Sequence, residues 1–277
     1  MKECHKLTAF IVGASSDIGL ALAEHWASLG MGIVGTFRTR SKDLEESNKT
    51  FNHLLHCDFS DKNSIRDCLQ TATDLDIKWD ILVICPGTMN PIGPFEDCNI
   101  DEWEQGILIN LLSPLRMVHG LLDLRKKSKA MPLVVFFAGG GVNGAPENYS
   151  CYTTSKIALT KATELLDAEF ADVRFSIIGP GWVKTKIHRE TLIGSTRAKS
   201  SAKETKRRLE SDDFNPMEKV LEFIDTLIDL PKNIIGGRNF SVVHDHLGGA
   251  NLKEALQEHS NLYKLRRLGN EKIFDDV

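Results

Sequence analysis

The amino-acid sequence predicts a Rossmann-type, doubly wound α/β fold, in which helices cover both faces of a parallel sheet of about seven strands. Two observations lead to this prediction. Short runs of β-branched and apolar residues alternate with longer segments of helical pattern along most of the chain. Several of the short runs are apolar nearly throughout, as is typical of strands that are buried on both faces of a parallel sheet.

The predicted strands are the short apolar runs, at 7–12, 32–37, 54–58, 81–85, 133–137, 174–178 and 239–243. The predicted helices lie between them, at 18–29, 62–75, 101–124, 153–170 and 217–229. Alternation of this kind predicts right-handed βαβ units, with ligands bound at the carboxyl ends of the strands.

The whole chain, 1–277, is predicted to form a single domain, although two segments interrupt the alternation. Residues 186–215 are polar and rich in Lys, Arg, Ser and Thr, and we expect them to cover the mouth of the site as a lid. Residues 247–277 form a charged tail with Leu256, Leu262, Leu265 and Leu268 at near-helical spacing. This spacing predicts a helix docked within the protomer or across a subunit boundary.

Composition and charge exclude several classes of protein. The net charge of −4 and a pI of about 6.2 give no support for nucleic-acid binding. The six cysteines form no C-x-x-C pair, so no metal site is predicted, and single thiols favour a reducing cytoplasmic location. No run approaches the roughly 20 apolar residues that span a bilayer, so no membrane association is expected.

The first strand leads into a glycine turn that has the features of an anion site. Gly13 permits a tight turn, and Gly19 permits close packing of the following helix on the strand. Backbone N–H groups at the helix N-terminus, helped by serine hydroxyls, can then hold a phosphate. An ordinary β-to-α turn is the alternative. The predicted phosphate-binding residues are Gly13, Ser15, Ser16, Asp17, Ile18 and Gly19.

Two further strand ends carry candidate nucleotide contacts. The second strand ends in Arg38, where an acid would normally read a ribose 2′-hydroxyl, so NADP(H) is favoured over NAD(H), with Arg40 in support. The third strand ends in Asp58 and Phe59, which are candidates to bind and cover an adenine. The alternatives are a solvated surface charge for Arg38 and a helix N-terminal acid for Asp58.

Tyr152 and Lys156 stand four residues apart at the predicted start of a helix, which places both side chains on one helix face. Hydride transfer to a ketone leaves an alkoxide that needs a proton. A phenol can supply this proton, but its pKa of about 10 is far from neutrality. A nearby ammonium stabilises the phenolate and lowers that pKa, so this spacing suits carbonyl reduction.

These motifs, taken in order, resemble the short-chain dehydrogenase/reductase family in its shorter, single-domain branch, from about Thr8 to Val243. The remaining matches are Pro86-Gly87 after the fourth strand, Asn110 in the next helix, and Pro180-Gly181-Trp182-Val183-x-Thr185 after the sixth strand. The resemblance implies that Asn110 holds a water that links Lys156 to solvent. It also implies that Pro180, Gly181, Val183 and Thr185 contact the nicotinamide and phosphates, together with Pro86 and Gly87.

The chain departs from the family pattern in three places. Asp17 replaces the middle glycine of the first turn, and Cys85-Pro86 replaces an Asn-Ala pair. At Ala138 the family usually carries a catalytic serine, whose loss can cost on the order of 10²-fold in rate. Three interpretations remain open: another donor such as Asn143 or Ser150 has taken over, the enzyme is impaired, or Ala138 is an engineered serine-to-alanine change.

The sequence therefore predicts an NAD(P)(H)-dependent oxidoreductase that interconverts a carbonyl and an alcohol. The basic residues of segment 186–215 favour an anionic small-molecule substrate, such as a nucleotide-linked sugar or a phosphorylated metabolite, although a solvated loop would look the same. The alternatives are a sugar epimerase or dehydratase with tightly held cofactor, and a catalytically impaired dinucleotide-binding protein. By resemblance, long helices would build a homodimer or homotetramer.

Overall fold

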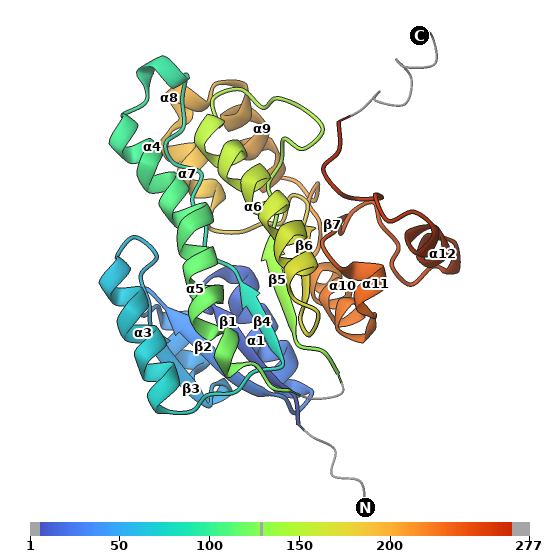
Figure 1. Cartoon of the computed structure of the whole chain (residues 1–277). Helices are drawn as coiled ribbons and strands as arrows, with labels where there is room; N and C mark the ends of the chain where they lie inside the picture. Colours follow the sequence, from blue (N-terminus) through green and yellow to red (C-terminus); the bar gives the residue numbers. More distant parts are fainter. Residues whose placement is uncertain (1–5, 128–129, 268–277) are drawn as a thin grey trace, which may run out of the picture.

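The computed structural model describes residues 6–127 and 130–267. Seven parallel strands form one sheet in the order β3-β2-β1-β4-β5-β6-β7 (Figure 1). The strands are β1 (Thr8–Val12), β2 (Gly32–Phe37), β3 (His53–His56), β4 (Ile81–Ile84), β5 (Leu133–Phe137), β6 (Arg174–Gly179) and β7 (Asn239–Ser241). The predicted parallel α/β sheet is confirmed, and its chain order reverses between β1 and β4, where such folds bind ligands.

The helices of the sheet layers follow the predicted pattern closely. Their bounds are α1 (Asp17–Ser28), α3 (Lys62–Asp74), α4 (Ile100–Ile107), α5 (Ser113–Leu121), α6 (Ser150–Glu169) and α10 (Met217–Asp229). The predicted helix 101–124 runs from α4 to a 3₁₀ turn at Leu122–Leu124, with one π-helical turn at Leu108–Leu112 in between. Helix α6 begins three residues before the predicted start, so Tyr152 lies in its first turn.

Side chains on the two faces of the sheet belong to two separate hydrophobic cores. One core packs α1 and α10 against one face, and Trp26 Nε1 links these helices by donating to Asp225 Oδ1 at 2.7 Å. The other core packs α3, α5 and α6 against the opposite face, where Figure 1 shows these three helices in front of the strands. Both faces are therefore covered, which explains the nearly continuous apolar strands.

The long helical run that includes α4 and α5 resembles a membrane span in length and composition. In the described residues, Ile100–Leu124 is the one helix long and apolar enough to cross a bilayer by length and composition alone. A core helix passes the same test, and this run contacts α3 and α6 and carries the fully buried Asn110 at its π turn.

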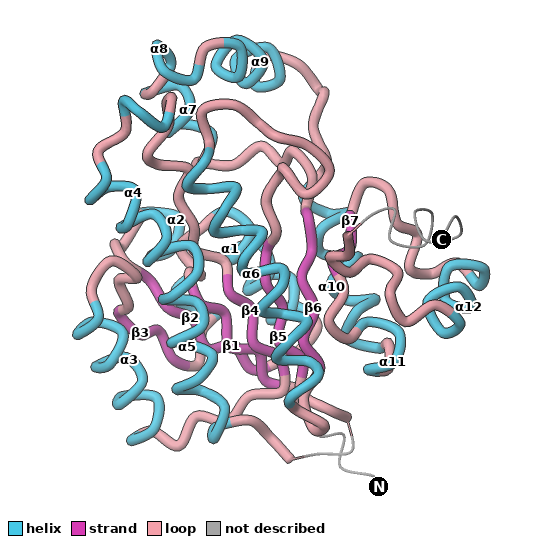
Figure 2. The backbone as a smooth tube through the Cα atoms, turned by 45° about the horizontal axis from the view of Figure 1, so that its top comes forward, coloured by secondary structure: helices cyan, strands magenta, loops and turns pink. Residues whose placement is uncertain are grey.

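Several short helices were not predicted. They are α2 (Lys42–Glu46), α7 (His188–Ile193), α8 (Ser195–Ala198), α9 (Ser200–Leu209) and α11 (Lys232–Ile235). In the tail, where the leucine spacing predicted a docked helix, α12 (Ala250–Glu258) forms. Helices α7, α8 and α9 form most of the predicted lid segment and gather at one end of the molecule, apart from the strands (Figure 2). Residues Ser195–Ala198 and Ser200–Leu209 are separated only by Lys199, whose φ of 49° breaks the helix.

The C-terminal tail differs from the docked helix that the leucine spacing predicted. Leu256 is fully buried in α12, but the chain then turns, and the backbone N–H of Asn239 in β7 donates to the Tyr263 carbonyl at 2.8 Å. Leu265 lies beyond this contact, outside any helix, and Leu268 lies outside the described residues. The tail therefore docks as α12 plus a turn whose Tyr263 carbonyl bonds to the edge strand β7.

Candidate active site

A cleft of about 1350 Å³ opens at the carboxyl ends of the strands, and turns after β1 to β7 line it. This volume exceeds the roughly 300–1000 Å³ of a pocket for one small ligand, so it can accommodate a dinucleotide with a substrate. Most of the predicted site residues line it: Gly13, Ser15, Ser16, Asp17, Ile18, Arg38, Asp58, Phe59, Pro86, Gly87, Ala138, Tyr152, Lys156, Pro180, Gly181, Val183 and Thr185. Gly19 and Asn110 lie behind this surface.

The turn after β1 is shaped for an anion. Gly13 has a φ of 76°, and a Cβ there would stand 2.9 Å from Pro86 Cγ, so both the turn and the packing require glycine. Thr36 fixes the turn by accepting hydrogen bonds from the N–H groups of Gly13 and Ala14. In the described chain, the N–H groups of Asp17 and Ile18 at the start of α1 have no acceptor, as expected for a helix N-terminus that can hold a phosphate.

Gly19 acts from beneath this turn. A Cβ at Gly19 would lie 2.4 Å from the Gly13 carbonyl oxygen, while the Gly19 N–H donates to the capping hydroxyl of Ser16 at 3.1 Å. Gly19 therefore allows the helix to approach the turn and does not itself face the cleft.

Asp17, the departure from the family pattern, has a cationic partner from a distant segment. The backbone N–H of Lys186 donates to Asp17 Oδ2 at 2.6 Å, and the Lys186 ammonium lies 3.5 Å from Oδ1. The same ammonium contacts Asp43 Oδ2 at 3.2 Å, and these two acids raise the pKa of Lys186. The start of the lid is therefore tied to the phosphate turn through Asp17.

The nucleotide end of the cleft carries Arg38 and Asp58. Arg38 is exposed and has no ion-pair partner among the described residues, whereas Arg40 lies over the Phe37 ring at 4.9 Å. Asp58 accepts from the backbone N–H and hydroxyl of Ser60 at 2.9 and 2.7 Å. Arg38 thus leaves an uncompensated positive charge at the end of β2.

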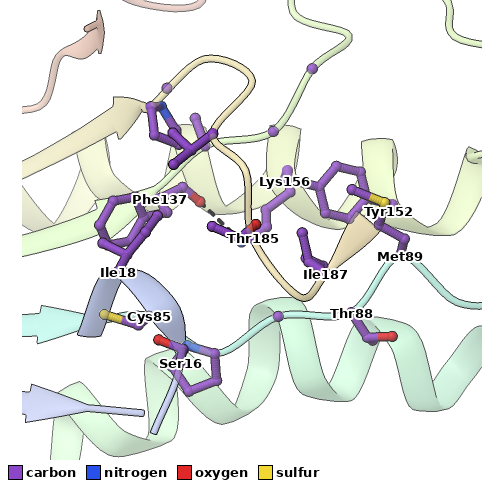
Figure 3. Close-up of a pocket in the computed structure, with 18 of the residues that line it drawn as sticks. Ser16, Ile18, Cys85, Thr88, Met89, Phe137, Tyr152, Lys156, Thr185 and Ile187 are labelled. Atoms are coloured by element: carbon purple, nitrogen blue, oxygen red, sulfur yellow. Dashed lines mark hydrogen bonds between the residues drawn. The ribbon is translucent and has the colours of Figure 1, made fainter. Parts of the chain in front are cut away.

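Tyr152 and Lys156 lie together near the middle of the cleft, where Figure 3 shows the Tyr152 ring close to Met89 and Ile187. The Lys156 ammonium lies 5.9 Å from the centre of the Tyr152 ring and donates to the Phe137 carbonyl at 3.0 Å. The hydrogen bond to Phe137 is the dashed line in Figure 3.

The ionisation of this pair differs from the sequence-based expectation. Burial raises the pKa of Tyr152 to about 12, and the negative charge of Glu190 acts in the same direction. Burial lowers the pKa of Lys156 to about 8. In this structure Tyr152 is therefore a phenol at neutral pH, and Lys156 loses its proton far more easily than a solvated lysine.

Asn110 is fully buried and both ends of its amide are used. Its Oδ1 accepts from the Thr88 N–H at 2.9 Å and its Nδ2 donates to the Thr88 carbonyl at 2.8 Å. Asn110 lies at the π turn of the long helix, and such turns are frequent at functional sites. The side chain therefore fixes the loop after β4 beside Gly87 and Lys156.

The loop after β5 presents alanine and glycine where it meets Tyr152. Ala138 lines the cleft, and at Gly139 a Cβ would stand 2.6 Å from Tyr152 Cε1 and 2.9 Å from Lys156 Cγ. The Tyr152 ring therefore packs directly on the Gly139 backbone. Of the two proposed substitutes for serine, Asn143 lines the cleft, while Ser150 lies outside it and its hydroxyl accepts from Trp103 Nε1 at 3.3 Å.

The loop after β6 closes the cleft from the other side. Gly181 has a φ of 76°, and a Cβ there would be 2.5 Å from Val243 Cγ2. Trp182 stacks on the buried His188 with ring centres 4.0 Å apart, and His188 bonds the Val183 carbonyl. This packing fixes Val183 and Thr185 along the cleft wall.

Sequence reasoning missed three features of the cleft wall. Glu190 of α7 accepts from Thr88 Oγ1 at 2.9 Å and from the Met89 N–H at 2.6 Å, which ties the lid to the loop after β4. Cys85 lies beside Ser16, and burial raises the pKa of its thiol to about 12. Tyr263, Lys264 and Leu265 of the tail also line the cleft. No local pattern identifies Glu190 or the tail residues as part of the cleft, because they arrive from distant segments, whereas Cys85 directly follows β4.

Most cations of the lid face elsewhere. Of the nine basic residues of this segment, the described cleft wall includes only Lys186 and His188. Arg207 and Arg208 contact Glu204, and Arg207 also contacts Asp213. Lys199, Lys203 and Lys206 surround a second hollow of about 630 Å³ on α8 and α9. The described residues contain no group of three or more His, Cys, Asp or Glu side chains that could hold a metal ion.

The similarities to known proteins cover most of the chain. The family model for short chain dehydrogenases matches residues 7–194. A D-β-hydroxybutyrate dehydrogenase of Rhizobium meliloti is 26% identical over 206 residues, which are 71% of this chain and 79% of that protein. A probable NADP-dependent mannitol dehydrogenase of Yarrowia lipolytica is 26% identical over 188 residues, which are 65% of this chain and 67% of that protein.

Solved structures show the same fold. A short-chain dehydrogenase/reductase from Saccharomyces cerevisiae superposes with a TM-score of 0.74 at 20% identity, covering 89% of this chain and 99% of that one. An aldohexose dehydrogenase from Thermoplasma acidophilum gives a TM-score of 0.70 at 19% identity, covering 86% of this chain and 92% of that one.

Proposed function

The chain belongs to the short-chain dehydrogenase family, whose members are oxidoreductases that act on CH–OH groups with nicotinamide cofactors. On this premise we propose that the protein reduces a ketone, or oxidises the corresponding alcohol, at Tyr152. The observation that carries the proposal is the pairing of Tyr152 and Lys156 in a cleft that also contains the free N–H groups of Asp17 and Ile18. A bound nicotinamide would supply or accept the hydride.

The side chains of the cleft suit the reductive direction near neutral pH. With its raised pKa, Tyr152 holds a proton that it can donate to the substrate oxygen as negative charge develops there. The Lys156 ammonium stabilises the phenolate that remains, and Asn110 holds the loop of Gly87 and Thr88 against the lysine. The phenolate would regain its proton from the Lys156 ammonium, and a water at Asn110 would return a proton to Lys156.

For the cofactor we propose NADP(H). The free N–H groups at the start of α1 and the left-handed Gly13 fit a pyrophosphate, and Arg38 offers an unpaired guanidinium for a 2′-phosphate. Pro180, Gly181, Val183 and Thr185, with Pro86, would hold the nicotinamide end, and Asp58 and Phe59 the adenine. Kd for NADPH and NADH should converge in Arg38→Ala. An unchanged preference would refute the role of Arg38.

For the substrate we propose an anionic metabolite, such as a nucleotide-linked sugar or phosphorylated compound, whose neutral end meets Tyr152. Its anionic part would lie outward, away from the carboxylate of Glu190, which shares the Tyr152 region with the Lys156 ammonium. On the lid, Lys199 and Lys203 have no ion pair in the described residues. Binding of a nucleotide sugar and of the bare sugar tests this idea. Equal affinities would discard the anionic substrate.

We propose a cytoplasmic homodimer or homotetramer built on the long helices, where Leu112 and Leu165 are about half exposed. Sedimentation of wild type and Leu165→Glu measures this, since a charge on a helix-to-helix interface would shift the protein to monomers.

A direct assay tests the proposed reaction. Wild-type protein with NADPH deuterated at C4 should transfer deuterium to the carbonyl carbon of a ketone that it reduces, and Tyr152→Phe should lower kcat by about 10²-fold or more while keeping Kd for NADPH. Binding of NADPH without label transfer to any carbonyl compound would contradict the proposal.

A further inference from the structure

Glu190 is a carboxylate that the proposed reaction does not use, although it lies on the wall of the catalytic cleft. It stands in the first turn of α7 and is half-buried. One of its oxygens, Oε2, accepts both hydrogen bonds from the loop after β4, from Thr88 Oγ1 and the Met89 N–H. Glu190 is therefore held in a defined position by two donors.

The second oxygen of Glu190 is left without a partner. No hydrogen bond to Oε1 and no cation within ion-pair distance of Glu190 occurs in the described part of the chain. The ammonium of Lys156, which lines the same cleft, is directed to the Phe137 carbonyl. A half-buried carboxylate oxygen with unused acceptor capacity favours a ligand that carries a hydrogen-bond donor.

The position of Glu190 relative to the reacting groups is set by its neighbours. The two residues that donate to Glu190, Thr88 and Met89, lie in the loop after β4. The backbone N–H of Met89 bonds to Glu190, and its side chain lies close to the Tyr152 ring in Figure 3. Glu190 and Tyr152 line the same cleft, and the charge of Glu190 adds to burial in raising the pKa of Tyr152. A substrate group that reaches Glu190 would therefore lie on the Met89 side of the cleft, where the Tyr152 ring also lies.

We infer that Glu190 Oε1 binds a hydroxyl or amino group on the carbon adjacent to the reacting carbonyl. The substrates are then α-hydroxy or α-amino ketones, and their products are vicinal diols or amino alcohols. The inference rests on the proposed oxidoreductase function. In the reductive direction the C=O π bond breaks, the carbon gains a hydride from the nicotinamide, and the oxygen gains the proton of Tyr152. The adjacent hydroxyl or amine is unchanged and serves only for recognition.

Glu190→Gln has nearly the same shape as the native side chain and tests the role of Oε1. The Met89 N–H can only donate, so the Gln carbonyl oxygen must occupy the Oε2 position, and its amide NH₂ takes the place of Oε1. Both lid contacts are preserved, while the charged acceptor that faces the substrate is lost. Thr88→Val serves as the control, because it removes one lid contact while the Met89 N–H contact and both carboxylate oxygens of Glu190 are retained.

The test compares kcat/KM for 2-hydroxycyclohexanone and cyclohexanone with NADPH. Wild type should favour the hydroxyketone by about 10- to 100-fold, and Glu190→Gln should reduce this ratio by about tenfold, because hydrogen bonds to charged acceptors are about twice as strong as neutral ones. Thr88→Val should keep the ratio within about threefold. An unchanged ratio in Glu190→Gln, or an equal loss in Thr88→Val, overturns the inference.

A binding measurement separates this inference from the proposed function. Calorimetry of the cofactor-free protein should show tighter binding of trans-1,2-cyclohexanediol than of cyclohexanol, with the difference lost in Glu190→Gln. Turnover of both ketones without discrimination leaves the oxidoreductase function standing and overturns the role of Glu190. Glu190-dependent diol binding without turnover of any ketone supports the recognition site and overturns the proposed reaction.

Discussion

The Tyr152 ring lies against the backbone of Gly139, and this contact explains the glycine at this position of the loop after β5. A Cβ at Gly139 would press on both the ring and the Lys156 side chain, whereas Ala138 already carries its Cβ at the cleft wall. The two neighbouring positions therefore respond to substitution in opposite ways.

We predict that Ala138→Ser increases kcat/KM by about tenfold or more, because a hydroxyl at this position can help polarise the substrate carbonyl. Gly139→Ala should lower kcat/KM by a similar factor, because the added methyl displaces Tyr152. Steady-state assays with one ketone measure both variants. No gain in Ala138→Ser would indicate that Asn143 or another donor already polarises the carbonyl.

The ionisation of Lys156 predicts the pH dependence of ketone reduction. The ammonium is lost as the pH rises through about 8, whereas Tyr152 keeps its proton until about pH 12. We therefore expect kcat/KM to fall above pH 8 with a slope of one proton. Lys156→Arg, whose guanidinium stays protonated, should move the fall to higher pH even if the overall rate is lower. A profile that is flat to pH 10 would contradict this assignment.

The same residue lowers the stability of the folded state. Because the pKa of Lys156 is about 8 when folded and 10.5 in the unfolded chain, folding at pH 7 places an ammonium in a site that disfavours it. We expect Lys156→Met to raise the free energy of unfolding by up to about 3 kcal/mol at pH 7.

The gain from Lys156→Met should shrink as the pH rises from 8 to 10.5, since the native lysine then loses its proton as well. Denaturant unfolding at several pH values measures this. Lys161→Met is the control, because Lys161 lies on the same helix with an exposed ammonium that contacts Glu164. A similar gain in the control would show that burial of Lys156 is not the cause.

At the scale of elements, the start of the lid is tied to the phosphate turn by Lys186, which balances the carboxylates of Asp17 and Asp43. We predict that Lys186→Met weakens NADPH binding by about tenfold at low salt, because Asp17 would then face the pyrophosphate without a counter-charge.

A second change tests the cause of this weakening. Asp17→Gly combined with Lys186→Met should recover most of the lost affinity, since the repelling carboxylate is gone. Fluorescence titration with NADPH measures Kd for the single and double variants. If the double variant binds NADPH no more tightly than Lys186→Met alone, Lys186 contacts the cofactor directly.

At the scale of the whole molecule, the tail is joined to the sheet layer by Arg266, which contacts both carboxylate oxygens of Glu164 on α6 at 3.0 and 2.7 Å. Arg266 holds the pKa of Glu164 at about 2, below the ordinary value of 4.5. This contact therefore stabilises the fold above pH 4.5 and is lost as the pH falls toward 2.

We predict that Glu164→Gln lowers the free energy of unfolding by about 1 kcal/mol or less at pH 7, since the partner is partly exposed, and Tm by about 2–4 °C. The difference should vanish near pH 2. Glu169→Gln on the same helix, which is exposed, should leave Tm unchanged. Equal shifts in both variants would show that helix charge, and not the tail, is responsible.

The sequence by itself determined the features that depend on local chemistry. The glycine turn before α1, the strand–helix alternation and the four-residue spacing of Tyr152 and Lys156 are short-range patterns, and the structure brings Gly13, Arg38 and the Tyr152–Lys156 pair to one cleft. Only the tertiary structure decided which distant groups surround that pair: Glu190 from the lid, Gly139 beneath the tyrosine ring, Lys186 on Asp17, and the tail at Tyr263. These contacts join segments far apart in the chain, so no local pattern records them, and they set the charge and the space around the substrate.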